Sequence, residues 1–199
     1  MFDSGVTARG FIDEIKREVD AAPDIEDATY YRFIDECEQL LYSEVIRETE
    51  IYSPLGMPAP GFLSFAYIET TGDKVRYEDI YAVYAGDVQL VRATPAGART
   101  FPDSYSRIGE TLYIKSDNKA EIDIYFYVRP KPKLRPGGEN DTIKLPVEWL
   151  PIIGAKVRGE AYKLVNEDYA AAKWLADYNA LVEQFKQYMA ARAADIGIR

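Results

Sequence analysis

"LPVEWLPIIGAKVRGEAYKLVNEDYAAAKWLADYNALVEQF", residues 145–185, is the stretch that decides the expected fold of this 199-residue chain. Apolar and small side chains recur in it at steps of three and four, the spacing of one face of an α-helix. The polar break "VNED" divides this seam, so two helices are expected to form an antiparallel hairpin. Pro146 stands where a first helical turn tolerates proline, and Gly154, Ala155 and Gly159 should let a neighbour pack close. The seam residues are Leu150, Gly154, Val157, Ala161 and Leu164, then Ala171, Leu175, Tyr178, Val182, Phe185 and Met189.

Two more helices are expected near the N-terminus. Apolar residues at helical spacing predict the first over residues 7–19, with Pro23 at or beyond its end. A stronger pattern predicts the second over residues 27–50, capped by Asp27 or Thr29. Its apolar stripe consists of Tyr30, Phe33, Ile34, Cys37, Leu40, Leu41 and Val45. Its charged residues, expected mostly on a solvated face, are Asp35, Glu36, Glu44 and Glu48.

Between residues 62 and 129 the period of the pattern changes to two, which is typical of strands. Five runs rich in β-branched and aromatic residues are separated by turn signals: "FLSFAYIE", "DIYAVYA", "DVQLVRA", "TLYIKS" and "EIDIYFYVR". They predict an antiparallel sheet or a small sandwich made of hairpins, with "SDNKAE" as one hairpin turn. The proline-rich segment 53–61 precedes the runs. The long loop 94–106 is expected to carry contacts, which makes Arg99 and Phe101 candidate interface residues.

The order of elements predicts an α+β fold: N-terminal helices, an inserted antiparallel β-sheet and a C-terminal antiparallel helical hairpin. Residues 1–52 and 145–199 are expected to form one helical body, and residues 62–129 the inserted β domain. Residues 130–144 are expected to form an extended connector.

Prolines alternate with basic residues in "RPKPKLRPGG", residues 129–138, so this segment should be stiff and close to polyproline II. It is either a connector that crosses the surface or a basic arm that docks on an acidic partner. The second interpretation makes Arg129, Lys131, Lys133 and Arg135 candidate interface residues. If it holds, charge reversal at both lysines should leave the fold intact and weaken docking.

The residue types leave little room for catalysis. The chain has no histidine and one cysteine, which removes the commonest general base and the usual zinc ligand sets. No phosphate-binding glycine loop is present. Acidic pairs such as Glu139 with Asp141 and Glu167 with Asp168 lack calcium-loop spacing and favour solvated turns. We therefore expect no enzyme activity, no catalytic residue, no metal and no cofactor.

Charge, hydropathy and a few single residues limit the remaining functions. A net charge of −9 argues against a surface that captures nucleic acid. No apolar run is long enough to span a membrane, and the N-terminus lacks a secretory pattern. Cys37 is expected to be a small buried apolar residue, in keeping with a reducing compartment. The 16 tyrosines suit half-buried sheets and wet interfaces. Trp149 and Trp174 either pack against the sheet or, for Trp174, form an outward interface anchor.

The segment "IYFYVRPKPKL" followed by "IKLPVEWLPIIGAKVRGEAYKLVNEDYAAAKWLADYNALVEQFKQYM" resembles the head-to-tail adaptor, or connector, proteins of tailed bacteriophages, including the tail-tubular type. The resemblance covers roughly residues 121–192, and its motifs record packing rather than chemistry. It implies a virion structural protein, made in the host cytoplasm, that joins the capsid to the tail. It also implies a ring of about twelve subunits below the portal.

The partners implied by this resemblance are further copies of the chain, the portal protein and a downstream tail or neck protein. DNA would pass through the ring during genome ejection without specific binding. Three alternatives stay open: another phage neck or tail-completion protein, an acidic inhibitor-type module that binds proteins, and a carboxylate-based hydrolase. The inhibitor requires an acidic patch, and the hydrolase requires a cleft with two converging carboxylates.

Overall fold

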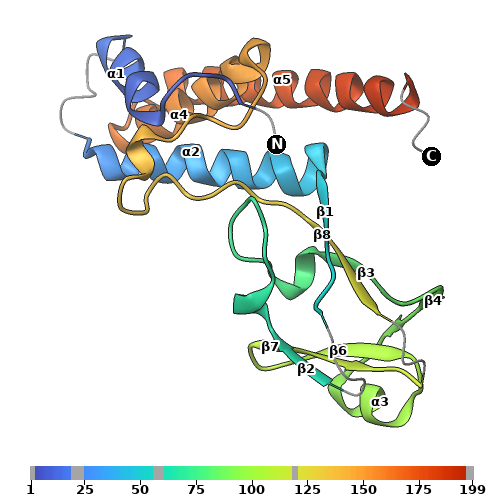
Figure 1. Ribbon diagram of the computed structural model, residues 1–199. Coiled ribbons are helices and arrows are strands. Elements are labelled where there is room, and N and C mark those ends of the chain that lie inside the picture. Colours follow the sequence, from blue (N-terminus) through green and yellow to red (C-terminus); the bar gives the residue numbers. More distant parts are fainter. Residues whose placement is uncertain (1–2, 19–24, 56–60, 118–120, 196–199) are drawn as a thin grey trace. The chain divides into compact units, whose positions relative to one another are not determined.

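The computed structural model describes residues 3–18, 25–55, 61–117 and 121–195 (Figure 1). The chain forms two compact units. Met1–Ile46 and Pro130–Arg199 form the helical unit, and Arg47–Arg129 form the sheet unit. Because the chain leaves the helical unit once and returns once, the sheet unit is an insertion. The predicted α+β class, with helices at both ends and strands between them, is confirmed.

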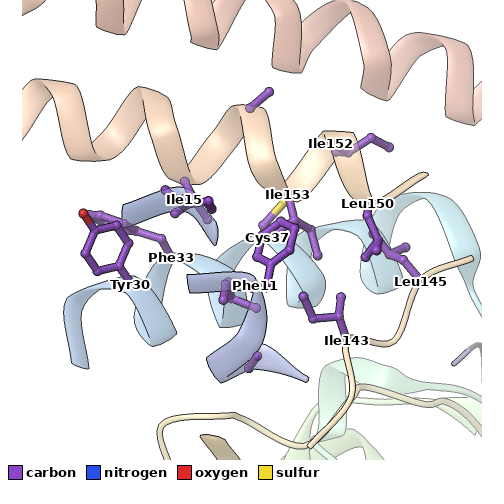
Figure 2. Close-up of a cluster of buried hydrophobic side chains, with 14 of the residues drawn as sticks. Phe11, Ile15, Tyr30, Phe33, Cys37, Ile143, Leu145, Leu150, Ile152 and Ile153 are labelled. Atoms are coloured by element: carbon purple, nitrogen blue, oxygen red, sulfur yellow. The ribbon is translucent and has the colours of Figure 1, made fainter. Parts of the chain in front are cut away.

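The helical unit is built around α4, the helix from Leu150 to Leu164. α4 contacts both α2 (Asp27–Leu41) and α5 (Asp168–Asp195), and it lies between them (Figure 2). α1 (Ala8–Glu18) packs against α2. Two short 3-10 turns precede α4: Gly138–Asn140 lies within the connector, and Val147–Trp149 directly precedes α4. Because α4 has neighbours on opposite sides, its sequence is apolar over more than one face. Within the described residues, no helix combines the length and apolar character needed to cross a membrane.

The core of the helical unit joins segments far apart in the sequence (Figure 2). Burying each large aliphatic side chain stabilises the fold by about 1.5–3 kcal/mol. Cys37 is fully buried among these residues, and burial raises the pKa of its thiol to about 12. It therefore has the buried role that its position predicts. Labelled members of the core are Phe11, Ile15, Tyr30, Phe33, Cys37, Ile143, Leu145, Leu150, Ile152 and Ile153.

The predicted hairpin is present, with its turn between Leu164 and Asp168. Asn166 in this turn adopts a left-handed φ of 60°, which asparagine tolerates better than most residues. Val157 and Phe185 of the predicted seam are fully buried. Leu164 departs from the prediction because it is 52% exposed at the end of α4. Gly159 lies at a close approach of the two helices, since a Cβ there would lie 2.8 Å from the Leu175 side chain.

Several predicted boundaries in the helical unit were wrong. α2 ends at Leu41, and a π-helical turn continues to Ile46. The chain then forms strand β1 from Thr49 to Tyr52, so the helical unit ends before residue 52. The α2 cap is Glu26, which makes no side-chain capping bond, and Asp27 pairs instead with Lys16. Pro146 caps the 3-10 turn rather than α4. The predicted positions 19 and 23 lie outside the described residues.

The described residues of the sheet unit form two four-stranded sheets, ordered β1-β8-β3-β4 and β2-β7-β6-β5. Neighbouring strands are antiparallel except β5 and β6, which are parallel. The inward side chains, such as Val83, Ile124 and Leu112, form a second core. The strands after β1 are Gly61–Ser64, Ile80–Ala85, Val88–Gln89, Val91–Arg92, Ser104–Ile108, Thr111–Lys115 and Ile122–Tyr127. The short helices of this unit are Phe65–Tyr67, Tyr77–Asp79 and α3, Pro95–Thr100.

Two predictions about the strands were wrong. The expected loop 94–106 contains α3 and the start of β6, where buried Ser104 and Ser106 conceal the strand pattern. "TLYIKS" and "EIDIYFYVR" form β7 and β8, which belong to different sheets, so "SDNKAE" does not close a hairpin. Residues 118–120 of that segment, and residues 56–60 of the predicted proline-rich break, lie outside the described residues.

Gly159→Ala is expected to lower the free energy of unfolding by about 1–3 kcal/mol, because the new methyl group forces α4 and α5 apart at Leu175. Gly154→Ala is the matched control. Its Cβ would meet the end of the Arg158 side chain and no part of α5, so Arg158 must shift but the two helices need not separate. Alanine also favours a helix over glycine by up to about 1 kcal/mol, which offsets part of that cost. Urea unfolding followed by circular dichroism measures both. Equal stabilities of the two variants would contradict the close approach at Gly159.

Candidate functional site

A hollow of about 640 Å³ lies on the helical unit between α1, α4 and α5. This volume is within the range of small-ligand and side-chain binding pockets. We call it the α1/α4/α5 hollow. Its apolar lining includes Phe11 of α1, Leu150, Pro151 and Ala155 of α4, and Trp174 and Leu181 of α5.

Helical periodicity explains how the sequence builds this hollow. On α4 the lining positions 151, 154, 155 and 158 follow one another at helical spacing, as do positions 174, 177, 181 and 184 on α5. Each wall is therefore one face of one helix. Gly154 and Ala155 are the smallest residues on the α4 wall, so the surface of α4 is recessed at their position and forms the floor of the hollow.

Trp174 is held in place at the wall of the hollow by Arg158. The Arg158 guanidinium lies 5.1 Å from the centroid of the Trp174 ring, a cation–π contact. Arg158 Nε also donates to Glu18 Oε2 at 2.9 Å, and its side chain is 14% exposed. The positive charge of Arg158 is thus compensated within the protein. Trp174 itself is half-buried, and its predicted role as an interface anchor stays a prediction.

The rim of the hollow is acidic. Glu14 reaches it from α1 and Asp177 from α5, and both residues are exposed. Within the described parts of the chain neither carboxylate takes part in an ion pair. Two uncompensated negative charges therefore face the hollow from different walls.

Among the described residues, the lining contains no serine, threonine, cysteine, lysine or tyrosine, so its candidate nucleophiles or bases are the carboxylates of Glu14 and Asp177. Two carboxylates at one hollow are what the hydrolase alternative requires, and this alternative stays a prediction. Across residues 3–18, 25–55, 61–117 and 121–195, no three acidic or cysteine side chains are grouped to hold a metal ion. The arrangement fits binding of an apolar surface with basic neighbours.

The predicted basic arm is bound by the chain's own α2, and we call this contact the α2 clasp. Lys133 Nζ lies 2.8 Å from Glu38 Oε2, and both side chains are 1% exposed. Glu38 Oε1 accepts the Lys144 backbone N–H at 2.6 Å. Asp35 accepts the backbone N–H groups of Lys133 and Leu134 at 2.6 and 3.1 Å. The connector therefore runs along α2 (Figure 1), and Lys133 is not available to a partner.

The charges of the α2 clasp depend on each other. Burial raises the pKa of Glu38, while the Lys133 ammonium and the Lys144 N–H oppose that rise. A charge buried in this way is tolerated only when it is paired and hydrogen-bonded. The sequence did carry a signal for Glu38, because Ile34, Glu38 and Leu41 lie at helical spacing on the buried stripe.

The other predicted interface residues have separate environments. Arg129 Nε donates to the buried Asp79 Oδ1 at 2.6 Å within the sheet unit. Arg135 pairs with Asp141 in the helical unit. Lys131 is exposed. Arg99 and Phe101 are exposed in the sheet unit, where the Phe101 ring covers Gly97. The interface roles of the exposed residues stay predictions.

Trp149 packs inside the helical unit. Its ring lies 4.9 Å from that of Phe185 and 5.4 Å from that of Tyr188, measured between centroids. The interpretation in which it packs against the sheet was therefore wrong.

The sheet unit carries a tyrosine cluster on the outer face of β3 and β8. Tyr81 stacks on Tyr127 with centroids 4.8 Å apart, and Tyr84 meets Tyr125 edge to face at 5.4 Å. Tyr81 is 42% exposed. These rings account for part of the high tyrosine content, as expected for a half-buried sheet. Among the described residues, these rings contact one another and no group of charged side chains, so the cluster indicates no particular class of ligand.

Comparison with known proteins gives a distant and partial similarity. No protein-family model matches the chain. It is similar to a protein named "Ribosome biogenesis protein BOP1 homolog" from Leishmania major, at 28% identity over 134 residues. The match covers 63% of this chain and 16% of that protein. The chain thus spans about one sixth of the length of this relative.

This similarity contradicts the expected phage head-to-tail adaptor. The virion location, the ring, the portal and tail partners and the alternative phage neck role are withdrawn with it. Nothing in the comparison favours an acidic inhibitor-type module. The resemblance rested on the seam of the hairpin and on the strand and connector before it. Such patterns record packing, and one packing pattern can serve unrelated functions.

Lys133→Met is expected to lower the free energy of unfolding by about 3–5 kcal/mol, because Glu38 is left buried without its cation. Lys133→Glu should be at least as damaging, which corrects the expectation that charge reversal leaves the fold intact. Urea unfolding measures both.

Two controls accompany these variants. Lys131→Met changes an exposed position and should alter the stability by less than about 0.5 kcal/mol. Lys133→Met combined with Glu38→Gln keeps an oxygen for the Lys144 N–H and should recover much of the loss. A mild effect of Lys133→Met, similar to that of Lys131→Met, would refute the clasp.

Proposed function

We propose that the chain is a non-catalytic docking module that holds a partner protein within a larger assembly. The observation that carries this proposal is the α1/α4/α5 hollow. It combines an apolar floor, a tryptophan oriented by Arg158 and two unpaired carboxylates at the rim. Interfaces concentrate their binding energy in aromatic anchors of this kind, surrounded by a polar rim. The described lining offers no serine, threonine, cysteine, lysine or tyrosine, and its two carboxylates are exposed, which supports docking over a reaction.

We further propose ribosome assembly as the setting. Support comes from the similarity to a protein named for ribosome biogenesis. Because the chain spans only 16% of that protein, the proposal concerns the setting alone and not the activity of the whole relative. A docking module is a role that one part of a larger assembly factor can fill.

Filling the hollow should release the partner without disturbing the fold. Ala180 lines the hollow at an exposed position of α5, so Ala180→Gln adds bulk there and keeps a good helix former. Trp174→Ala removes the aromatic anchor. Proteins that co-purify with the chain from cells producing it are quantified by mass spectrometry, and those held by the hollow should fall by about tenfold or more.

Ala172→Gln is the matched control, because Ala172 is exposed on α5 and lies outside the lining. Thermal melts of all three variants show whether each remains folded. If wild type, Ala180→Gln and Ala172→Gln retain the same proteins in the same amounts, the hollow is not the docking site and the proposal fails.

A further inference from the structure

We infer that the α1/α4/α5 hollow receives an amphipathic helix whose apolar stripe is flanked by lysine or arginine residues. This inference rests on the proposed docking function and names the chemistry of its partner. The apolar stripe would lie on Phe11, Leu150 and Leu181, and Trp174 would form one side of the contact. The basic residues would lie beside Glu14 and Asp177 at the rim.

The walls favour a helix over an extended peptide. α1, α4 and α5 supply the lining mainly through helical side chains, and most of their backbone N–H and C=O groups are bonded within the helices. An extended peptide would find no sheet edge here to satisfy its own backbone. A helix satisfies its backbone internally and presents apolar side chains along one face, so it matches a groove between helices.

The charges at the rim favour a basic partner. Arg158, the one basic residue among the described residues of the lining, is already paired with Glu18 and covers Trp174. The remaining charges, Glu14 and Asp177, are negative. Complementary charges at a rim increase the association rate and exclude partners of the wrong sign. The same charges, with the net charge of −9, disfavour RNA as the ligand, because nucleic acid binding depends on neutralising phosphates.

The test uses three synthetic helices of about 18 residues with the same leucine stripe and with lysine, glutamine or glutamate beside it. Binding of each labelled helix to the full chain is measured by fluorescence anisotropy at low and high salt. The lysine helix should bind about tenfold more tightly than the glutamine helix, and the glutamate helix most weakly. The lysine advantage should shrink at high salt, because exposed charges are then screened.

Variants assign the binding to the hollow. Glu14→Gln with Asp177→Asn should remove the lysine advantage and leave the glutamine helix unaffected. Ala180→Gln should weaken the lysine and glutamine helices together, and Ala172→Gln should weaken neither. A single-stranded RNA oligonucleotide is tested in parallel, and RNA binding that Ala180→Gln weakens would overturn the inference.

The outcomes separate this inference from the proposed function. Equal binding of the lysine and glutamine helices, both weakened by Ala180→Gln, would refute the basic partner and leave the docking function standing. If no helix binds while Ala180→Gln still releases proteins from the cellular complex, the partner is not a helix of this kind. If no helix binds and Ala180→Gln releases no protein, both proposals fail.

Discussion

The buried carboxylate of Glu38 is the constraint on which the helical unit depends. It accepts from the Lys133 ammonium and from the Lys144 backbone N–H, two groups of the segment by which the chain returns from the sheet unit. A carboxylate left without partners in this position would cost several kcal/mol, so the connector has one favoured register along α2. That register places Ile143 and Leu145, on either side of Lys144, in the core. It also fixes where the chain enters α4.

The position of α4 then determines the hollow. One side of α4 packs on α2 and another on α5, where Gly159 permits a close approach to Leu175. The face with Gly154 and Ala155 is left between α1 and α5 and forms the floor. A polar contact on one side of the unit thus supports an apolar surface on another. The same helix uses small residues in two ways, to bring one neighbour close and to leave room for a ligand.

The local sequence pattern was sufficient to predict those parts of the fold that depend on a single face of one helix. The seam through Val157 and Phe185 follows from periodicity, and so does the class of the fold. Other features depend on distant partners. Glu38 lies on the apolar stripe, but its burial is only possible because Lys133 pairs with it. The strand pattern of β6 could not be recognised in the sequence, because the buried residues Ser104 and Ser106 are polar. The hollow also needs α1, and the patterns of α4 and α5 alone do not predict where α1 packs.

The same distinction explains why the functional interpretation had to change. The hairpin seam and the connector record how the chain packs against itself, and several functions are compatible with such packing. Charged side chains that form ion pairs within the protein are equally uninformative about partners. Lys133 is paired with Glu38, Arg129 with Asp79 and Arg158 with Glu18. The informative charges are those that the fold leaves uncompensated beside an apolar surface. Glu14 and Asp177 meet that condition, and only the arrangement of α1 relative to α5 places them at one rim.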